Sequence, residues 1–165
     1  MSHSEHRAAS HAHRASCLVI TCSDTRTLET DTSGDVICER LAAEGHTVSE
    51  RHIIPDSPDE LERLLDTATG VHVTIITGGT GLSSRDTTYH TLARRYDSPI
   101  PGFGELFRML SFEEIGSAAM LSRASAGRMG DMIIFSLPGS VHAVRLAMER
   151  LILPEIGHMV RELGR

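Results

Sequence analysis

Lysine, asparagine, glutamine and tryptophan are absent from this chain of 165 residues, and all 16 basic residues are arginine. The absence of lysine excludes a Schiff base, a lysyl-adenylate intermediate and a phosphate loop built around lysine. Aromatic residues make up only 4% of the chain, and the formal net charge is −6. Broad nucleic-acid binding needs a basic face and stacking surfaces, so we expect no nucleic acid among the partners. A polar site must therefore use carboxylates, hydroxyls, imidazoles, arginine or the backbone.

Long hydrophobic runs are also missing, and no segment approaches the length of a bilayer span. The N-terminus alternates His, Ser, Ala and Arg, whereas a secretory signal needs an apolar stretch. We therefore expect a cytoplasmic protein without a membrane partner. Cysteine is scarce, since Cys17, Cys22 and Cys38 are odd in number and lack the spacing of a zinc knuckle. We expect these three residues to be buried, reduced thiols.

The residues that are present fit one compact domain, with 40% hydrophobic and 23% charged residues. Residues 1–16 differ from the rest because they are rich in small residues and histidine. The four histidines of this segment are His3, His6, His11 and His13. A metal-binding tail is one interpretation, but the composition favours a disordered His-rich arm without ligand geometry. We predict an arm over residues 1–16 and a single α/β domain over residues 17–165.

The first half of the domain alternates predicted strands and helices. Residues 17–21, 47–54 and 71–77 read as strands, because they are short, apolar or β-branched runs. Residues 32–45 read as a helix that ends at a glycine, and a capping box at Ser57 with Pro58 at the first helical position opens a second helix. Strands separated by helices imply right-handed crossovers. The sequence therefore predicts a three-layer αβα fold with a mostly parallel sheet.

The second half of the domain is less regular. Residues 97–107 contain two prolines and two glycines, and we predict a shaped loop there. The apolar runs around Gly130 and Asp131 predict a hairpin at one edge of the sheet. Ser140 is expected to cap a helix, and Pro154 is expected to kink or restart it, because proline has no amide to bond back to residue 150.

The segment TIITGGTGLSSRD, residues 74–86, places three glycines directly after a predicted strand. Gly78, Gly79 and Gly81 permit positive φ and close backbone approach, so successive N–H groups could hold an anion. The segment is neither a lysine-containing phosphate loop nor a dinucleotide fingerprint. The alternative is a tight strand-to-helix turn in which Asp86 or Thr87 caps the helix, and the glycines alone leave both interpretations open.

Two aspartates strengthen the ligand-binding interpretation. Asp56 comes at the end of the second predicted strand, and Ser57 already caps the following helix, which leaves Asp56 without an obvious structural role. Asp86 follows the glycine segment. Since the carboxyl ends of parallel strands meet at one edge of a sheet, both carboxylates are expected there, where they could hold Mg²⁺ between phosphate oxygens. The pair favours metal-assisted phosphoryl or nucleotidyl transfer.

Six motifs in order resemble the MoaB/MogA family of molybdenum cofactor biosynthesis proteins, and the resemblance covers essentially the whole chain after the arm. They are DTSG (31–34), IPD (54–56), TGGTG followed by RD (77–81 and 85–86), PGFGELFRMLSFEEIG (101–116), LSRA (121–124) and LPGS (137–140). The first and fourth motifs are closer to the MoaB branch. One departure is the segment RDTTYHTL, in which Tyr89 and His90 replace a proline and an acidic residue that are common in the family.

The resemblance implies a molybdopterin-binding fold and transfer of AMP from Mg-ATP to the terminal phosphate of molybdopterin, with release of pyrophosphate. It assigns Asp56 and Asp86 as the catalytic and metal-binding residues. The residues that it assigns to binding molybdopterin and ATP are Ser23, Asp24, Gly78, Gly79, Thr80, Gly81, Glu105, Gly139 and Ser140. Arg26 or Arg85 is expected to neutralise further charge, whereas His90 and His142 are expected to be surface or packing histidines.

The resemblance also implies a homo-oligomer, a trimer or a hexamer. The apolar side chains that we expect in the subunit contact are Phe103, Phe107, Met159 and Leu163. Other proteins of the molybdenum cofactor pathway are further candidate partners. Two different functions stay open: a non-catalytic molybdopterin-binding or scaffold protein, and a nucleotide-binding module like that of competence-damage-inducible proteins.

Overall fold

The structure, a computed structural model, describes residues 13–165. Most of the predicted arm, including His3, His6 and His11, therefore lies outside the described residues. The first strand begins at Ser16, and Ala15 is already buried against the core. Within residues 13–165, no helix is long and apolar enough to cross a bilayer.

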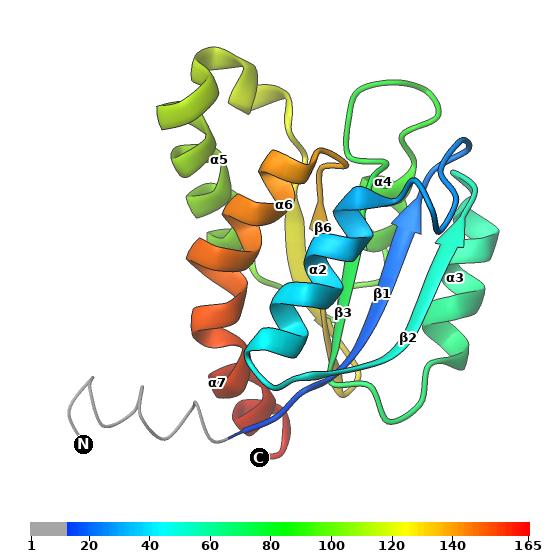
Figure 1. Cartoon of the computed structure of the whole chain (residues 1–165), viewed down its shortest axis with the longest axis vertical. Helices are drawn as coiled ribbons and strands as arrows, with labels where there is room; N and C mark the ends of the chain where they lie inside the picture. Colours follow the sequence, from blue (N-terminus) through cyan, green and yellow to red (C-terminus); the bar gives the residue numbers. More distant parts are fainter. Residues whose placement is uncertain (1–12) are drawn as a thin grey trace.

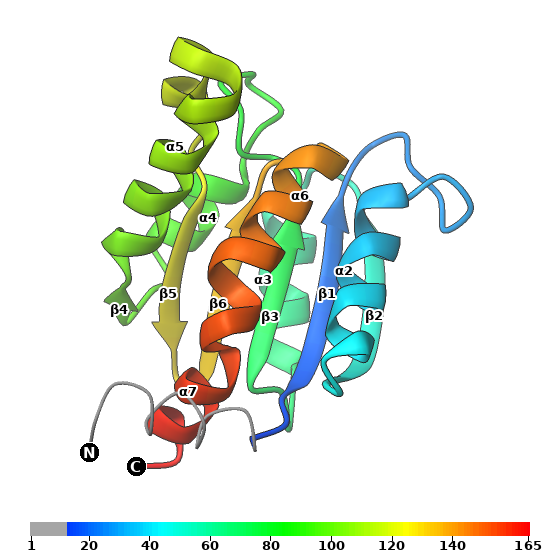
Figure 2. The same ribbon diagram turned by 60° about the vertical axis from the view of Figure 1, so that its left-hand side comes forward.

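A six-stranded sheet forms the middle layer, with the strand order β2-β1-β3-β6-β5-β4. Strands β1, β2, β3 and β6 run parallel, whereas β5 is antiparallel to β6 and β4 is antiparallel to β5. Figure 1 shows the parallel strands pointing to the same edge, and Figure 2 shows β5 running the other way. The strands are β1 (Ser16–Cys22), β2 (Thr47–Ile54), β3 (Val73–Thr77), β4 (Ser98–Pro99), β5 (Ser125–Met129) and β6 (Met132–Leu137).

Helices cover both faces of the sheet, as the αβα prediction requires. In Figures 1 and 2, α2, α5, α6 and α7 lie on one face and α3 and α4 on the other. The helices are α2 (Thr32–Ala43), α3 (Pro58–Thr67), α4 (Thr88–Ala93), α5 (Pro101–Ile115), α6 (Val141–Ala147) and α7 (Leu153–Leu163), with a 3₁₀ helix, η1 (Gly116–Leu121), and a π-helical turn, η2 (Met148–Ile152). The predicted α/β fold is confirmed.

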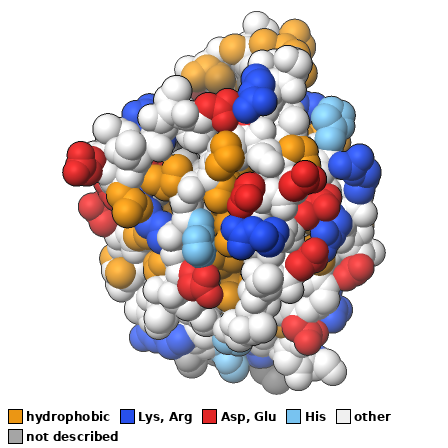
Figure 3. Space-filling view, turned by 90° about the vertical axis from the view of Figure 1, so that its right-hand side faces the viewer, with side chains coloured by type: hydrophobic (Ala, Val, Ile, Leu, Met, Phe, Trp, Pro, Cys, Tyr) orange, Lys and Arg blue, Asp and Glu red, His pale blue; other side chains and the backbone are white. Residues whose placement is uncertain are grey.

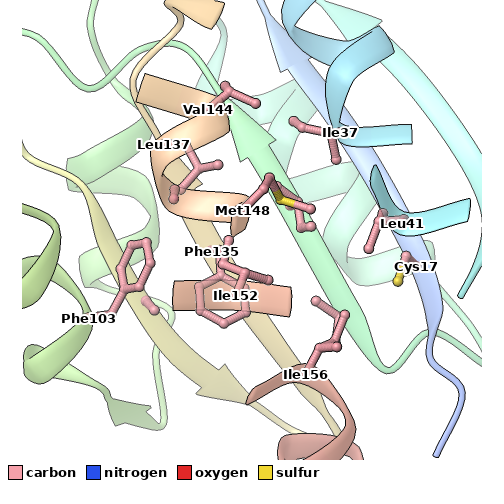
Figure 4. Packing of buried hydrophobic residues seen from close by; sticks show 14 of the residues in the cluster. Cys17, Ile37, Leu41, Phe103, Phe135, Leu137, Val144, Met148, Ile152 and Ile156 are labelled. Atoms are coloured by element: carbon pink, nitrogen blue, oxygen red, sulfur yellow. The ribbon is translucent and has the colours of Figure 1, made fainter. Parts of the chain in front are cut away.

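The two faces of the sheet bury two apolar clusters. The larger cluster packs side chains of α2, α5, α6 and α7 against β1, β3 and β6, and Figure 4 shows its centre. Phe135 on β6 lies edge-on to Phe103 of α5, with ring centroids 5.1 Å apart. The smaller cluster holds Leu61, Leu64 and Leu65 of α3 against the opposite face. Burial of this apolar surface on both sides is the main stabilisation of the sheet.

The predicted elements of the first half are confirmed, and their caps explain where they begin. The Ser57 hydroxyl accepts a hydrogen bond from the Glu60 amide, and Pro58 occupies the first helical position of α3. The helix α2 has a cap that was not predicted from the sequence. The carboxylate of Asp31, almost fully buried, accepts bonds from the Gly34 amide and the Thr21 hydroxyl and pairs with Arg51. An aspartate three residues before a glycine was the available signal.

The prediction of a shaped loop over residues 97–107 is wrong. Pro99 lies in the short edge strand β4, at a position where the sheet needs no N–H donor. Pro101 takes the first position of α5, where its missing amide costs nothing. Gly104 lies where α5 approaches the next segment, because a Cβ there would be 2.7 Å from the Ala124 carbonyl oxygen. Proline and glycine therefore fit this helix at the positions they occupy.

The predicted hairpin is confirmed as β5 and β6, with Gly130 at a φ of 57° in the turn. The predicted break before Pro154 is also confirmed. It takes the form of the π-helical turn η2, which lies between α6 and α7. Because proline cannot donate to the preceding turn, the helix widens there and continues.

The cysteines are free thiols in the described chain, as expected. Cys17 and Cys22 are buried in β1, and burial raises the pKa of each thiol to about 12. Cys38 is only half-buried, which corrects the expectation for that residue.

Two of the four side chains predicted for the subunit contact are core residues. Phe103 and Phe107 are only 6% and 1% exposed, because they lie on the face of α5 that packs on the sheet. The opposite face of α5 and η1 carries the exposed apolar side chains instead. They are Leu106, Met109, Phe112, Ile115, Met120 and Leu121, and we call them the α5 apolar face.

Candidate functional site

Loops from four parallel strands meet at one edge of the sheet. They follow β1 (residues 23–31), β2 (55–57), β3 (78–87) and β6 (138–140), and they lie at the top of Figure 1. This is the edge at which open parallel sheets bind ligands. The start of β5 reaches the same edge because that strand is reversed.

Glycine is required at two positions directly after β3. Gly78 has a φ of 96°, and a Cβ there would lie 2.2 Å from the Cys22 carbonyl oxygen. Gly79 has a φ of 71°, and its Cβ would lie 2.1 Å from the Thr88 hydroxyl. Both the left-handed conformation and the close approach exclude a side chain. The third glycine, Gly81, would place a Cβ 2.9 Å from the Asp86 carboxylate.

The turn made by these glycines leaves a row of free donors. The Gly78 amide bonds to the Leu137 carbonyl, at 3.0 Å, and so ties the loop to β6. The amides of residues 79–82 donate to no acceptor among residues 13–165. Successive unpaired amides at the end of a strand are the arrangement that binds phosphate oxygens.

Asp86 does not cap α4. Its carboxylate accepts a hydrogen bond from the Ser83 amide, at 2.9 Å, and so closes the loop on itself. Thr87 is the N-cap residue, and its side chain makes no cap bond. The helix therefore begins at Thr88, directly before the unusual Tyr89 and His90. One oxygen of Asp86 has this bond, and the side chain is partly exposed.

Asp24 connects three of the loops. One carboxylate oxygen accepts the Asp56 amide at 3.0 Å. The other accepts Nε and a terminal nitrogen of Arg85, at 3.1 and 2.7 Å. The Arg85 guanidinium, followed by the Asp56 amide, lowers the pKa of Asp24. The charge of Arg85 is therefore neutralised by Asp24. Arg26 donates to the Thr30 carbonyl within its own loop.

Asp56 experiences the opposite influence. Burial, and after it the charges of Asp24 and Asp86, raises the pKa of Asp56. The structure therefore places Asp56 and Asp86 within electrostatic reach of one another, as two carboxylates that repel. A cation between them would relieve that repulsion. Within residues 13–165, no group of three or more His, Cys, Asp or Glu side chains is arranged to hold a metal ion, so two carboxylates would need oxygen ligands from a substrate.

Three further predicted residues lie at the same edge and have structural partners. The Ser23 hydroxyl accepts bonds from the amides of Thr25 and Arg26, and so shapes the loop after β1. The Gly139 carbonyl accepts the Ser33 hydroxyl at 2.7 Å, and Ser140 caps α6 through the Ala143 amide. Ligand contact at these positions would come from backbone groups or from the remaining capacity of the hydroxyls.

Glu105 lies apart from these loops. It is exposed on α5 and lines a second hollow of about 510 Å³, which adjoins the loop after β3 through Arg123. The two histidines near the loops both have partners, since His142 pairs with Glu114 and His90 meets Arg123.

A smaller apolar pocket of about 160 Å³ lies beside the loop that follows β6. Phe107, Ile115 and Leu146 line its interior, and Pro138 and Ser140 form the side that belongs to that loop. The pocket is formed between α5, η1 and α6. It combines apolar walls with the hydroxyls of Ser111, Ser122 and Ser140.

Charges of both signs surround the outer strand. On the face that carries β2, acidic and basic side chains are interspersed (Figure 3). An ion pair joins Arg51 to Asp35 there, and a hydrogen bond joins His52 to Glu50.

At its carboxyl edge the mostly parallel sheet presents a row of free amides, two coupled aspartates and an adjacent apolar pocket. These features define a class, namely an α/β protein with a candidate anion-binding site at the carboxyl edge of its sheet. Comparison with known proteins makes the assignment narrower. A family model described as a probable molybdopterin binding domain matches residues 18–158. Molybdenum cofactor biosynthesis protein B of Halalkalibacterium halodurans is 49% identical in an alignment over 151 residues, and the match covers 89% of each chain.

Two solved structures agree with this match. A crystal structure of a molybdenum cofactor biosynthesis protein B has a TM-score of 0.88 and 47% identity, and the match covers 92% of this chain and 97% of that one. The tungsten cofactor synthesizing protein MoaB from Pyrococcus furiosus has a TM-score of 0.83 and 36% identity, over 92% and 98%. The chain belongs to the MoaB family of molybdopterin-binding domains. The family predicted from the six motifs is confirmed.

Proposed function

We propose that this protein acts in molybdenum cofactor biosynthesis as a molybdopterin adenylyltransferase, which moves AMP from Mg-ATP to the terminal phosphate of molybdopterin. The observation that carries the proposal is the pairing of free amides at residues 79–82 with the coupled carboxylates of Asp56 and Asp86 at one edge of the sheet. A protein that only stored the pterin would need the amides and the pocket, but it would gain nothing from two aspartates that repel each other.

The reaction joins two anions, so the protein has to position them and neutralise charge. An oxygen of the molybdopterin phosphate attacks the α-phosphorus of ATP, a new P–O bond forms, and the bond from that phosphorus to the β-phosphate oxygen breaks. Pyrophosphate leaves with the electron pair. The attacking phosphate is already ionised near neutral pH, so no general base is required.

Each part of the site has a task in this scheme. The amides of residues 79–82 would hold phosphate oxygens, because their N–H groups are free. Arg85 would hold the loops after β1 and β3 together at this edge through its bonds to Asp24. The apolar pocket beside Pro138 and Ser140 would receive the pterin ring, since its walls are mostly apolar and its hydroxyls can bond ring nitrogens.

Magnesium enters as part of the substrate Mg-ATP, and the residues present fit it. Asp56 and Asp86 would bind the ion, because carboxylates are its preferred protein ligands and the repulsion between the two is relieved by a cation. When bound, the ion supplies charge neutralisation at the phosphates. Asp56 is the first of the two residues to substitute. Only its backbone amide bonds to Asp24, so a change of the side chain leaves that hydrogen bond in place.

We further propose that the protein is a homo-oligomer, a trimer or a hexamer, and that the α5 apolar face is the contact surface. Six large apolar side chains on adjoining turns, each at least 47% exposed, exceed the scattered exposure that is normal for a monomer. None of the six side chains belongs to the loop after β3, but Ile115 also lines the apolar pocket, so association would place that pocket beside the subunit contact.

The test is an adenylyl-transfer assay with purified protein, molybdopterin and Mg-ATP. Formation of adenylylated molybdopterin together with pyrophosphate supports the transferase. The matched control is the ATP analogue with a methylene group between the α- and β-phosphates, which should bind without transfer because its leaving bond does not break. Tight pterin binding without product from ATP would refute the transferase and favour the scaffold function. Nucleotide binding without pterin binding would favour the nucleotide-binding module.

A further inference from the structure

Arg123 lies at the centre of the loop that follows β3, although it comes from a distant part of the chain. It precedes β5, and its side chain is only partly exposed. The Arg123 amide and Nε both donate to the Thr80 carbonyl, each at 3.3 Å. One terminal nitrogen donates to the carbonyls of Gly81 and Asp86. A single guanidinium therefore joins both ends of the loop.

The remaining contacts of this guanidinium are with the two residues that depart from the family motif. Its other terminal nitrogen lies 2.9 Å from Nε2 of His90, and its central carbon lies 5.1 Å from the centre of the Tyr89 ring. No carboxylate within residues 13–165 forms an ion pair with Arg123; the contacts are three carbonyl oxygens, an imidazole and an aromatic ring. Hydrogen bonds and the aromatic ring thus hold the guanidinium, and no carboxylate among residues 13–165 neutralises its charge.

These contacts fix the direction of three peptide groups. All peptide bonds described are trans, so the carbonyl of one residue and the N–H of the next point in opposite directions. With the carbonyls of Thr80, Gly81 and Asp86 turned toward Arg123, the N–H groups of the following residues, 81, 82 and 87, turn away from it. Two of these belong to the row of free amides.

A cation on the carbonyl side also strengthens the donors on the other side. Hydrogen bonds to an ionised donor are about twice as strong as neutral ones, and polarised peptide groups bind an anion more tightly. Because no carboxylate cancels the charge, its field reaches the same anion.

We propose that Arg123 is the positioning residue of the loop after β3, which we call the phosphate loop (residues 78–87). It binds the carbonyl side of the loop and so turns the amides of residues 81 and 82 toward the bound phosphate, without touching the phosphate itself. The proposal rests on the proposed function in one respect, namely that the loop after β3 binds phosphate. It adds the residue that sets the affinity of the loop, and it explains why an arginine is held among carbonyls.

The experiment measures binding of inorganic pyrophosphate, the proposed product, by titration calorimetry on the full chain. Arg123→Ala should bind pyrophosphate about 10- to 100-fold more weakly than the parent, the range expected for loss of charge-assisted bonds. Arg123→Lys should also lose at least about tenfold, because a point charge cannot replace the fork that reaches three carbonyls. The control is Arg95→Ala, which removes the ion pairs with Asp66 and Glu62 and should leave the affinity unchanged.

Rescue separates positioning from folding. Millimolar ethylguanidinium should fill the space left in Arg123→Ala and recover most of the affinity, whereas ethylammonium should not. If the alanine variant does not fold, the lysine variant decides. Parental affinity in either variant, or equal rescue by both cations, would overturn the assignment of Arg123. Absence of pyrophosphate binding in the parent would instead overturn the phosphate loop, and with it the proposed function.

Discussion

Gly79→Ala is the substitution whose cost can be worked out most directly from the structure. An alanine at a φ of 71° adopts the left-handed conformation, which costs about 1–2 kcal/mol for a residue with a Cβ. Its Cβ would also lie 2.1 Å from the Thr88 hydroxyl and 2.9 Å from the Thr88 Cβ. Thr88 is only 2% exposed, so moving it costs about 1–3 kcal/mol more. We expect a total loss of about 2–5 kcal/mol.

The chain contains a matched control for the backbone term. Gly70 has a φ of 67°, but nothing lies within 4 Å of a Cβ built there. Gly70→Ala should therefore cost only about 1–2 kcal/mol. Urea unfolding followed by circular dichroism would measure both free energies of unfolding, and pyrophosphate affinity should fall for Gly79→Ala alone. If the two variants lost the same free energy within about 0.5 kcal/mol, the close approach of Thr88 would not be a constraint.

A double-mutant cycle tests the assigned neighbour. Thr88→Ala removes the hydroxyl that overlaps with the new Cβ. The cost of Gly79→Ala should therefore fall by about 1 kcal/mol or more in the Thr88→Ala background. Strict additivity of the two changes would show that the strain of Gly79→Ala comes from another neighbour.

Three further predictions concern the carboxylates and the assembly. Asp56→Asn and Asp86→Asn should each keep pterin binding and lose about 100-fold or more in transfer rate, and the double variant should lose little beyond the worse single one; parental rates would show that these residues do not hold the metal. The raised pKa of Asp56 means that its carboxyl favours the folded state below pH ~4 and loses that contribution as the pH rises through the folded pKa. The stability of Asp56→Asn relative to the parent should therefore be higher at pH 7 than at pH 3 in unfolding experiments, and the reverse order would contradict the burial of Asp56 and its repulsion by Asp24 and Asp86. Light scattering should give the mass of three or six chains for the parent and a lower mass for Phe112→Glu, whereas a parent that is monomeric across a wide concentration range would exclude the α5 apolar face as a subunit contact.

The elements that the sequence predicted correctly are those whose signals are local. The capping box at Ser57, the glycine turn at Gly130 and the missing amide of Pro154 each act within a few residues of themselves. The loop predicted over residues 97–107 was wrong because the prediction used the proline and glycine content of this segment and not the position of each proline and glycine. Pro101 at the start of a helix and Gly104 against the Ala124 carbonyl are compatible with α5, and only the packing reveals that.

The candidate site also contains residues that local sequence signals reveal and contacts that they do not. The glycines after β3 and the aspartates that follow β2 and β3 could be found because a strand end fixes where the next residues lie. The contact of Asp24 with Arg85 and the contacts of Arg123 with the loop could not, because those partners are 61 and 37–43 residues apart in the chain. Such pairs depend on which strands become neighbours and on the reversal of β5.

The π-helical turn η2 also keeps a row of side chains in line. Val144, Met148, Ile152 and Ile156 are all buried and follow one another at intervals of four residues (Figure 4). In an unbroken α-helix of 3.6 residues per turn, each such step drifts by about 40°, so the row would rotate away from the sheet. The wider turn takes up the excess residue and brings the row back. Removing one residue from η2 would rotate everything after it by about 100°, so this segment tolerates a change of side chain better than a change of length.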